Sequence, residues 1–528
     1  MSQSKIVPLE KVGELIADRA VVTVSSSSGL GCPDATLRAI GEHYAKNGAP
    51  REVTSIHPIA AGDMYGIPGI DHLAQPGLLK RVFAGSYPSG PSSMPSPKIW
   101  QMIIQNEVEA YNIPSGILFH MHRESAAGRP GILTKVGMDT FVDPRRQGAR
   151  MNDCTPEFVR LVNFEGDEWL FFPSLPPNVA IIRATTADEH GNLTMEHEGA
   201  YLGAFDQALA ARNNRGVVIA QVKRLTEFGT LRPQQVRVPG ILVDHIVIDP
   251  DQKQTTQTSY NPAISGEVFR PLWDFKPIPW GVDKVIARRA AVELCEDDVV
   301  NLGFGICAMV PRILLDEDLH GEVTWVIEQG AVGGMPLLDF AFGCASNADA
   351  IVASPDQFTF FQGGGFDRSC LSFLQVDKEG SVNVSRLALR PHVTAGCGGF
   401  VDITANARSI LFCGYFTAGG LDLRIEDGRL RIAKEGKNKK FIPEVEHVTF
   451  SGRRARELRQ DVLYITERCV LRLEPEGLTV IEIAPGIDLN RDVLAQSEIA
   501  LRVSQSLKTM EERLFRPESF GLKLNPAA

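Results

Sequence analysis

Residues 324–341 read TWVIEQGAVGGMPLLDFA, and the rest of the chain is organised around this stretch. An apolar, partly β-branched run predicts a buried strand that ends at one acidic side chain, Glu328. Gly330, Gly333 and Gly334 follow, and an apolar segment after Pro336 has the character of a helix. A carboxylate at the end of a strand, followed by glycines that permit close backbone approach, is typical of a ligand site in an open α/β sheet. An ordinary strand-to-helix turn with an acid near the helix N-terminus fits this stretch equally well.

Length and composition indicate a globular protein of more than one domain. At 528 residues the chain is too long for a single core, and two or three domains are expected. Hydrophobic residues make up 44% and charged residues 22% of the chain, and the formal net charge is −10. This balance provides no basic surface for nucleic acid, so an anionic ligand must be bound by local Lys or Arg side chains or by backbone N–H groups.

The cysteines and the N-terminus favour a cytoplasmic protein. Nine cysteines are scattered along the chain without a C-x-x-C pair, which predicts reduced, mostly buried thiols rather than disulfides or a zinc site. The first residues lack the apolar core of a signal peptide, and no apolar run reaches membrane-spanning length. We therefore expect no membrane association.

The same order of elements occurs twice. In the front half, a helical face at residues 9–16 precedes a strand at 21–24, a Ser/Gly loop at 25–33 and another helix. In the back half, a helical face at 285–294 precedes a strand at 299–302, the loop holding Gly303 and Gly305, and a further apolar segment. A second pair of similar segments, ADEHGNL at 187–193 and VDKEGSV at 376–382, follows in the same order. Two related α/β halves are therefore predicted.

The predicted domains are residues 1–260, a Pro- and Trp-rich linker at 261–281, and residues 282–528, which carry Glu328. Within the back half, FTFF at 358–361 and VDIT at 401–404 have the character of strands, and alternating runs around Asp427–Gly428 and around PEG at 475–477 predict hairpins. The expected fold class is α/β, with two related open domains of mainly parallel sheet plus antiparallel hairpins.

Two other kinds of site, a dinucleotide-binding site and a metal site, are also compatible with parts of the sequence. Gly303–Ala308 fits G-x-G-x-x-A after a strand, and Glu328 stands about where a ribose-binding acid belongs, which supports a nicotinamide-dependent oxidoreductase. A strand containing His120 and His122 would place both imidazoles on one face, with Glu124 beyond, as in some metal hydrolases. Without further His or Asp clusters, satisfied histidines are the better interpretation, and no metal is expected.

A third set of segments resembles the family I CoA-transferases of the acetate/3-ketoacid and propionate type. The resemblance is carried in the back half by IEQGAVGGMP, QGGGFD, LQVDKEGSVNVS and TAGCGGFVDIT, and in the front half by VEAYNIPSG and GILTKVGMDTFVDPR. The tail contributes FCGYFTAGG, KKFIPEVEHVTFSG and IEIAPGIDL. These segments span nearly the whole chain and are long enough to be specific.

The resemblance implies two fused CoA-transferase domains, alpha-type then beta-type, and a ping-pong reaction. Glu328 is implied as the nucleophile that becomes a glutamyl-CoA thioester, and the Gly399 N–H as a donor to the oxyanion. Gly363, Gly364, Gly365, Gly398, Gly303 and Gly305 are the candidates for contact with CoA and the acyl group. The expected substrates are a short or medium acyl-CoA and a free carboxylic acid, as in short-chain fatty acid metabolism, with CoA as substrate and no bound cofactor. A homodimer or homotetramer is expected.

The chain departs from the family pattern at two positions. Ser115 stands where the family has a Gln that is taken to donate to the oxyanion, and Cys307 stands where the glycine loop commonly has Pro. Because Ser is shorter than Gln, the substitution predicts an acyl group bulkier than acetate. An acyl-CoA hydrolase on the same scaffold is the near alternative function.

Overall fold

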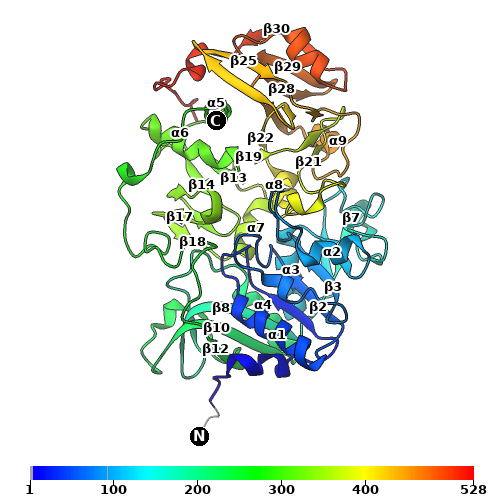
Figure 1. The fold of residues 1–528 in the computed structure, drawn as a ribbon, viewed down its shortest axis with the longest axis vertical. Helices are drawn as coiled ribbons and strands as arrows, with labels where there is room; N and C mark the ends of the chain where they lie inside the picture. The colour runs from blue at the N-terminus through cyan, green and yellow to red at the C-terminus, as the bar shows by residue number, and fades with distance from the viewer. Residues whose placement is uncertain (1–3, 92, 528) are drawn as a thin grey trace.

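The computed structural model describes residues 4–91 and 93–527 (Figure 1). The front half forms one nine-stranded sheet, and the back half forms a ten-stranded sheet, stacked end to end along the long axis of the molecule. Both sheets are mainly parallel and have helices packed on them, so the predicted α/β class is confirmed. The division into domains at residues 261–281 stays a prediction.

The front sheet has the order β11-β9-β8-β1-β2-β3-β4, and β10 pairs with β8 and β12. Its strands are β1 (Val21–Val24), β2 (Val53–His57), β3 (Leu79–Ala84), β4 (Glu109–Asn112), β8 (Val179–Asp188), β9 (Leu193–Thr194), β10 (Val217–Thr226), β11 (Val236–Val238) and β12 (His245–Ile248). Its helices are α1 (Asp34–Asn47), α2 (Lys98–Ile104), α3 (Ser115–Ala126) and α4 (Ala204–Asn213). A small antiparallel sheet of β5 (Gly131–Thr134), β6 (Arg160–Phe164) and β7 (Asp167–Pro173) packs beside them.

The back sheet has the order β18-β15-β14-β13-β19-β22-β27-β28-β29-β30. Its strands are β13 (Val299–Leu302), β14 (Thr324–Val326), β15 (Ala331–Val332), β18 (Ala350–Ile351), β19 (Arg368–Ser372), β22 (Ser409–Cys413), β27 (Asp461–Ile465), β28 (Cys469–Glu474), β29 (Gly477–Ile483) and β30 (Arg502–Thr509). Its helices are α5 (Val282–Ala291), α6 (Val310–Asp316), α7 (Ser354–Gln362), α8 (Phe400–Asn406) and α9 (Gly452–Leu458). The run β14-β13-β19-β22-β27 is parallel throughout, so the loops after these strands meet at one edge.

Short antiparallel pairs complete the back half. They are β16 (Met335–Pro336) with β17 (Ala345–Ser346), β20 (Gln375–Val376) with β21 (Val382–Asn383), β23 (Thr417–Ala418) with β26 (Asn438–Lys439), and β24 (Asp422–Glu426) with β25 (Arg429–Lys434). The last pair and β28–β29 are the two hairpins that the alternation predicts.

The internal repeat is visible at the level of single hydrogen bonds. After β8, the Asp188 carboxylate accepts from the N–H groups of His190 (3.0 Å) and Asn192 (2.9 Å). Between β20 and β21, Asp377 accepts in the same way from Glu379 (2.9 Å) and Ser381 (2.8 Å). Each side chain thus mimics a backbone turn with the same two bonds, as Asp does in Asx turns, which explains why both sequences carry D-x-x-G.

Three segments differ from the sequence-based expectation. FTFF lies in α7 and VDIT lies in α8, and both are helices rather than strands. The segment after Pro336 contains only one short 3-10 helix, Asp339–Ala341. Aromatic and β-branched residues favour strands locally, but tertiary packing overrides that preference here. One face of each helix is buried, with Phe358 and Phe361 in α7 and Val401 and Ile403 in α8, whereas Phe360 is exposed.

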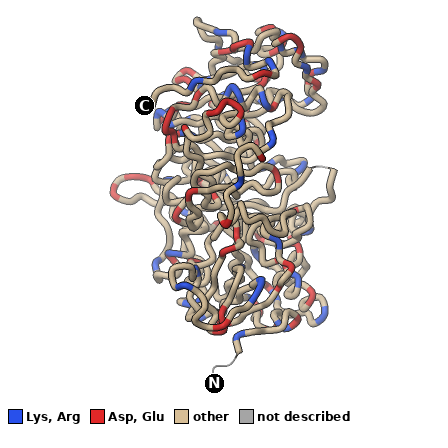
Figure 2. The backbone as a smooth tube through the Cα atoms, turned by 90° about the vertical axis from the view of Figure 1, so that its left-hand side faces the viewer, with Lys and Arg blue, Asp and Glu red and all other residues tan. Residues whose placement is uncertain are grey.

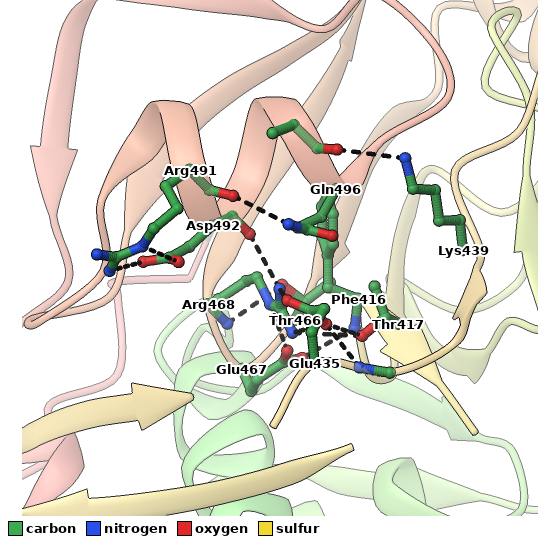
Figure 3. Close-up of polar contacts among 12 residues, drawn as sticks. Phe416, Thr417, Glu435, Lys439, Thr466, Glu467, Arg468, Arg491, Asp492 and Gln496 are labelled. Atoms are coloured by element: carbon green, nitrogen blue, oxygen red, sulfur yellow. Dashed lines mark hydrogen bonds and ion pairs between the residues drawn. The ribbon is translucent and has the colours of Figure 1, made fainter. Parts of the chain in front are cut away.

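In Figure 2, the positively charged residues (Lys and Arg) and the negatively charged residues (Asp and Glu) are interspersed along the backbone. One ion pair, Arg468 with Glu467, is fully buried just beyond β27, and the partly buried Glu435 contacts the same guanidinium (Figure 3). The Arg468 guanidinium donates to Glu467 Oε1 (2.7 Å) and Glu435 Oε2 (2.8 Å), and also to the carbonyl oxygen of Asp492 (2.9 Å). The N–H of Phe416 donates to Glu467 Oε2 (2.9 Å), so this network also fixes the loop after β22.

All nine cysteines are free thiols, and every one except Cys154 is buried. None of the helices in the described ranges combines the length and the apolar character that a membrane crossing requires.

Candidate active site

Glu328 lies two residues beyond β14, at the shared edge of the parallel strands. The chain reverses there, because Ile327 N–H donates to the carbonyl oxygen of Ala331 (2.9 Å) and Gly330 N–H donates to that of Ile327 (2.9 Å). Gly330 has φ +120°, and a Cβ at this position would overlap the carbonyl oxygen of Val352. A glycine is therefore required to turn the chain directly after the acid.

The Glu328 carboxylate accepts hydrogen bonds from uncharged donors. Its Oε2 accepts from the Gly399 N–H (3.1 Å), and its Oε1 accepts from Gln329 Nε2 (3.2 Å). Among the residues that the structure describes, no Lys or Arg forms an ion pair with it. Burial raises the pKa of Glu328 to about 7, and the two hydrogen bonds oppose this only in part. The residue is nevertheless only half-buried, so a substrate has access to it.

The Gly399 N–H is supplied by a segment that crosses from the back half onto the front half. We call residues 395–402 the glycine strap. Its Gly398 N–H donates to the carbonyl oxygen of Gly85 (2.8 Å), and its Gly398 carbonyl accepts from the N–H of Ser115 (2.9 Å). A Cβ on Gly399 would overlap Glu328 Oε2, so only glycine permits this approach. The front half therefore fixes the donor that faces the back half's carboxylate.

Asn112, at the end of β4, ties the strap down from the other side. Its Oδ1 accepts from the Cys397 N–H (2.9 Å), while its Nδ2 donates to the carbonyl oxygen of Gly85 (2.7 Å). The side chain is only 3% exposed and bonds with both ends of its amide. Its place in YNIPSG gives a sequence signal for this role, but the sequence does not show which segment it holds.

Gln329 forms a second link between the halves. Its Nε2 donates both to Glu328 Oε1 (3.2 Å) and to Ser27 Oγ in the front-half Ser/Gly loop (3.1 Å). The side chain packs against Gly343, where a Cβ would lie 2.9 Å from Gln329 Cδ. Sequence reasoning missed Gln329, although its position directly after the acid was a usable signal.

Ser115 does not reach Glu328. It is the first residue of α3 and is fully buried, and its Oγ lies against Gly85 without a hydrogen-bond partner in the described residues. Only its backbone N–H contributes to the site, through Gly398. The hydroxyl thus leaves the family's side-chain donor unreplaced, and Gln329 is the side-chain amide that contacts the carboxylate.

The remaining predicted glycines lie around this centre without a contact to Glu328. Gly303 and Gly305 follow β13, the neighbour of β14, and therefore leave the sheet at the same edge as Glu328. Gly305 has φ +91°, which suits its tight loop. Gly363–Gly365 follow α7, and Gly364 (φ +70°) packs against the backbone of Asn406. Their contact with CoA stays a prediction.

Cys307, at the second departure from the family pattern, is fully buried in the 3-10 helix Ile306–Met309. It belongs to the hydrophobic core beneath the glycine loop rather than to the surface of the site.

The prediction that His120 and His122 lie on a strand is wrong. His120 and His122 lie in α3, a helix rather than a strand, so they do not share a face. His122 is buried and bonds through Nδ1 to the carbonyl oxygen of Leu118 (2.7 Å) and through Nε2 to Thr23 Oγ1 (2.8 Å). Within residues 4–91 and 93–527, no three His, Cys, Asp or Glu side chains are grouped to hold a metal ion.

Comparisons with known proteins give a consistent result. The family described as Coenzyme A transferase matches residues 10–249. The acetate CoA-transferase YdiF of Escherichia coli K12 is 40% identical over 97% of this chain and 95% of its own length. The caffeate CoA-transferase of Acetobacterium woodii is 38% identical over 98% of this chain and 99% of its own.

Solved structures agree with this result. The crystal structure of the YdiF apoenzyme from E. coli O157:H7 superposes with a TM-score of 0.92 at 38% identity, covering 99% of this chain and 98% of that one. The same protein as a thioester complex with CoA gives a TM-score of 0.90. This full-length likeness sets aside the nicotinamide-dependent alternative. The chain belongs to the coenzyme A transferase family, as its motifs predict, and is a CoA-transferase.

Proposed function

We propose that this enzyme transfers CoA from an acyl-CoA to a free carboxylic acid by a ping-pong reaction through a glutamyl-CoA thioester on Glu328. The observation that carries the proposal is the setting of Glu328, a carboxylate just beyond a strand that accepts a hydrogen bond from the Gly399 N–H (3.1 Å) and has no ion-pair partner in the part of the chain that the structure describes. A cation would lower the nucleophilicity of the carboxylate and hold it in place. Backbone and amide donors stabilise charge without neutralising it.

The first half-reaction has two steps. Glu328 Oε attacks the thioester carbonyl carbon, the C–S bond breaks, and CoA leaves as its thiolate, which gives an acyl-glutamyl anhydride. The thiolate then attacks Glu328 Cδ, the bond between Cδ and the bridging anhydride oxygen breaks, and the first carboxylate leaves with that oxygen. The glutamyl-CoA thioester remains, and an acceptor carboxylate reverses both steps to form the new acyl-CoA.

The side chains around Glu328 act mainly on the second step. When the thiolate attacks Cδ, negative charge develops on a glutamyl oxygen, and the Gly399 N–H and Gln329 Nε2 already point at these oxygens. Such preorganised donors require no rearrangement as the charge forms. The raised pKa makes Glu328 more basic and hence more nucleophilic than an exposed carboxylate, although only the ionised fraction reacts.

Incubation with acetyl-CoA without an acceptor acid, followed by peptide mass mapping, tests the nucleophile. A CoA adduct is expected on the peptide that contains Glu328. An adduct on another residue, or full activity in Glu328→Ala, would contradict the proposal. If the enzyme continues to release free CoA when no acceptor acid is present, water is the acceptor, and the hydrolase alternative is correct instead.

The preferred acyl group is proposed to be bulkier than acetate. The support is Ser115, whose short side chain replaces the family's Gln and lies against Gly85. One relative of about equal identity is named for acetate and the other for caffeate, so the family alone does not decide the choice. A panel of short, branched and aromatic acyl-CoA donors, each with acetate as acceptor, ranks them by kcat/KM.

The proposal also includes a cytoplasmic homodimer or homotetramer with a role in short-chain acyl-CoA metabolism. The set of free, mostly buried thiols supports a reducing compartment. Light scattering of the purified enzyme tests the oligomeric state.

A further inference from the structure

A second buried carboxyl group lies next to the reaction centre, and the reaction just proposed does not use it. Asp402, in the first turn of α8, is 0% exposed. It follows Gly399 by three residues, so the same short segment carries both the carboxylate and the N–H that faces Glu328. No Lys or Arg in the described ranges forms an ion pair with it.

Each Asp402 oxygen has a defined partner on a different element. Oδ2 accepts from the Gly116 N–H at the start of α3 (2.9 Å), and Oδ1 accepts from Gln362 Nε2 at the end of α7 (2.7 Å). Gly116 allows this approach because a Cβ there would lie 2.6 Å from Asp402 Oδ1. Asp402 therefore joins α8 to the front half and to α7 at one point.

We propose that Asp402 is a positioning residue that fastens the glycine strap to α3 and thereby fixes the Gly399 N–H against Glu328. Asp402 closes the C-terminal side of the strap, as Asn112 closes its N-terminal side. Gly399 lies between these two ties. The inference rests on the proposed nucleophile, because Gly399 matters only if Glu328 reacts.

The charge of Asp402 adds a property that a purely structural tie lacks. Burial, with a smaller contribution from the charge of Glu328, raises the pKa of Asp402 to about 7, although the hydrogen bonds from Gly116 and Gln362 oppose the shift. Because repulsion between like charges is mutual, ionised Asp402 disfavours ionised Glu328. Of the other titratable groups nearby, Cys397 on the strap has its pKa raised by burial and by Asp402, and His120 of α3 reaches Asp402 only through Gln362.

Two substitutions separate the tie from the charge. Asp402→Ala removes both acceptors and is expected to lower kcat by ~10²-fold, with KM for acyl-CoA changed by less than ~3-fold, because a misplaced donor acts on the transition state rather than on binding. Asp402→Asn keeps an acceptor for Gly116, and Gln362 can turn its amide to match. Its expected loss is ~10-fold. Because its charge is gone, the acidic limb of the kcat/KM profile should move to lower pH.

Asp206→Asn is the matched control. Asp206 is also a buried carboxyl whose pKa burial raises, but it lies in α4 and pairs with Arg123. This variant should leave the acidic limb where the wild type has it. An unmoved limb in Asp402→Asn, an equal shift in Asp206→Asn, or an Asp402→Ala variant with wild-type kcat would each overturn the inference.

If Asp402→Ala does not fold, Gly116→Ala provides the second test. It displaces the carboxylate while retaining its charge, so kcat should fall without a shift of the limb to lower pH, and wild-type kcat would overturn the inference. Failure of the proposed nucleophile is recognised separately, because the wild-type enzyme would then form no CoA adduct on Glu328.

Discussion

Two acidic residues stand just past the ends of parallel strands in the back sheet, and the protein treats them in opposite ways. Glu467 follows β27, is 0% exposed, and is paired with Arg468, which is equally buried. Glu328 follows β14, is half-buried, and forms no ion pair with a Lys or Arg among the described residues. Position along the strand is the same, so the difference lies in what surrounds each carboxylate.

The buried pair of Glu467 and Arg468 stabilises the structure around it. Arg468 has carboxylate, carbonyl and hydroxyl acceptors around it, and Glu467 accepts from a backbone N–H as well (Figure 3). A buried charge with every partner in place is costly to disturb and has no reason to react. The cation-free carboxylate keeps a raised pKa and open access, and that combination marks a functional site. The same reasoning draws attention to Asp402.

The largest expected effect follows from removing the unpaired carboxylate. Glu328→Gln should reduce kcat by about 10⁵-fold or more, since the neutral amide of Gln cannot act as the nucleophile that forms the thioester. Glu328→Asp should also be severely impaired, because it withdraws the nucleophile by about 1.5 Å. Steady-state transfer assays measure both losses, with Glu467→Gln as a control that disturbs a buried acid away from the reaction. Appreciable turnover in Glu328→Gln would show that Glu328 is not the nucleophile.

Breaking the paired site should act on stability instead. Arg468→Leu leaves Glu467 buried without its cation, and the free energy of unfolding should fall by about 3–5 kcal/mol. Denaturant titration of wild type and variant measures the difference. Arg491→Leu is the matched control, because Arg491 pairs with Asp492 in the same region but is largely exposed, and its loss should change the free energy of unfolding far less. Equal losses in the two variants would contradict the comparison.

Removing the unpaired carboxylate should stabilise the fold, and only at higher pH. The pKa of Glu328 rises from 4.5 to about 7 on folding, so the group is protonated in both states below about pH 4.5 and has no charge to desolvate. Between pH 4.5 and 7 the unfolded state releases its proton first, and stability falls as pH rises. The free energy of unfolding of Glu328→Gln should therefore exceed that of the wild type by up to about 3 kcal/mol at pH 8 and by almost nothing at pH 4. A difference that is constant with pH would mean that Glu328 is solvated in the folded protein.

A smaller effect is expected at Ser115. Ser115→Gln introduces a longer side chain and an amide donor beside the strap, and should raise the ratio of kcat/KM for acetyl-CoA over a bulkier acyl-CoA by about 10-fold. Ser115→Ala is the control, since it removes only a hydroxyl that has no partner in the described residues. If wild type already prefers acetate and the Gln variant does not change that preference, Ser115 is only a helix-start residue.

No effect is expected from chelation. Backbone and amide groups face Glu328, and His122 uses both ring nitrogens in hydrogen bonds within the front half. Prolonged dialysis against a chelator, followed by the transfer assay and metal analysis, should leave the rate unchanged. Loss of a stoichiometric metal together with activity would revive the metal-hydrolase alternative.

Much of this protein follows from its sequence alone. The α/β class, the repeated order of elements, the two hairpins and the strand that ends just before Glu328 all follow from short-range patterns, namely hydrophobic periodicity, turn residues and glycines at fixed offsets. The family segments identify the reaction class for the same reason, because each is a contiguous piece of the site. The D-x-x-G turns are the clearest case, since each is closed entirely by its own residues.

What the sequence did not decide depends on contacts between distant residues. FTFF and VDIT have strand-like composition, but the surfaces on which they pack make them helices, as α7 and α8. The sequence predicts Asp402 only as one position in a strand. Only the fold brings it into contact with Gly116, which is 286 positions away in the sequence, and beside Glu328. Likewise the contact of Gly399 with Glu328 requires the front half to hold the strap. Local patterns determine which groups are available, whereas the raised pKa and the aimed donors arise from desolvation and packing, which exist only once the two halves meet.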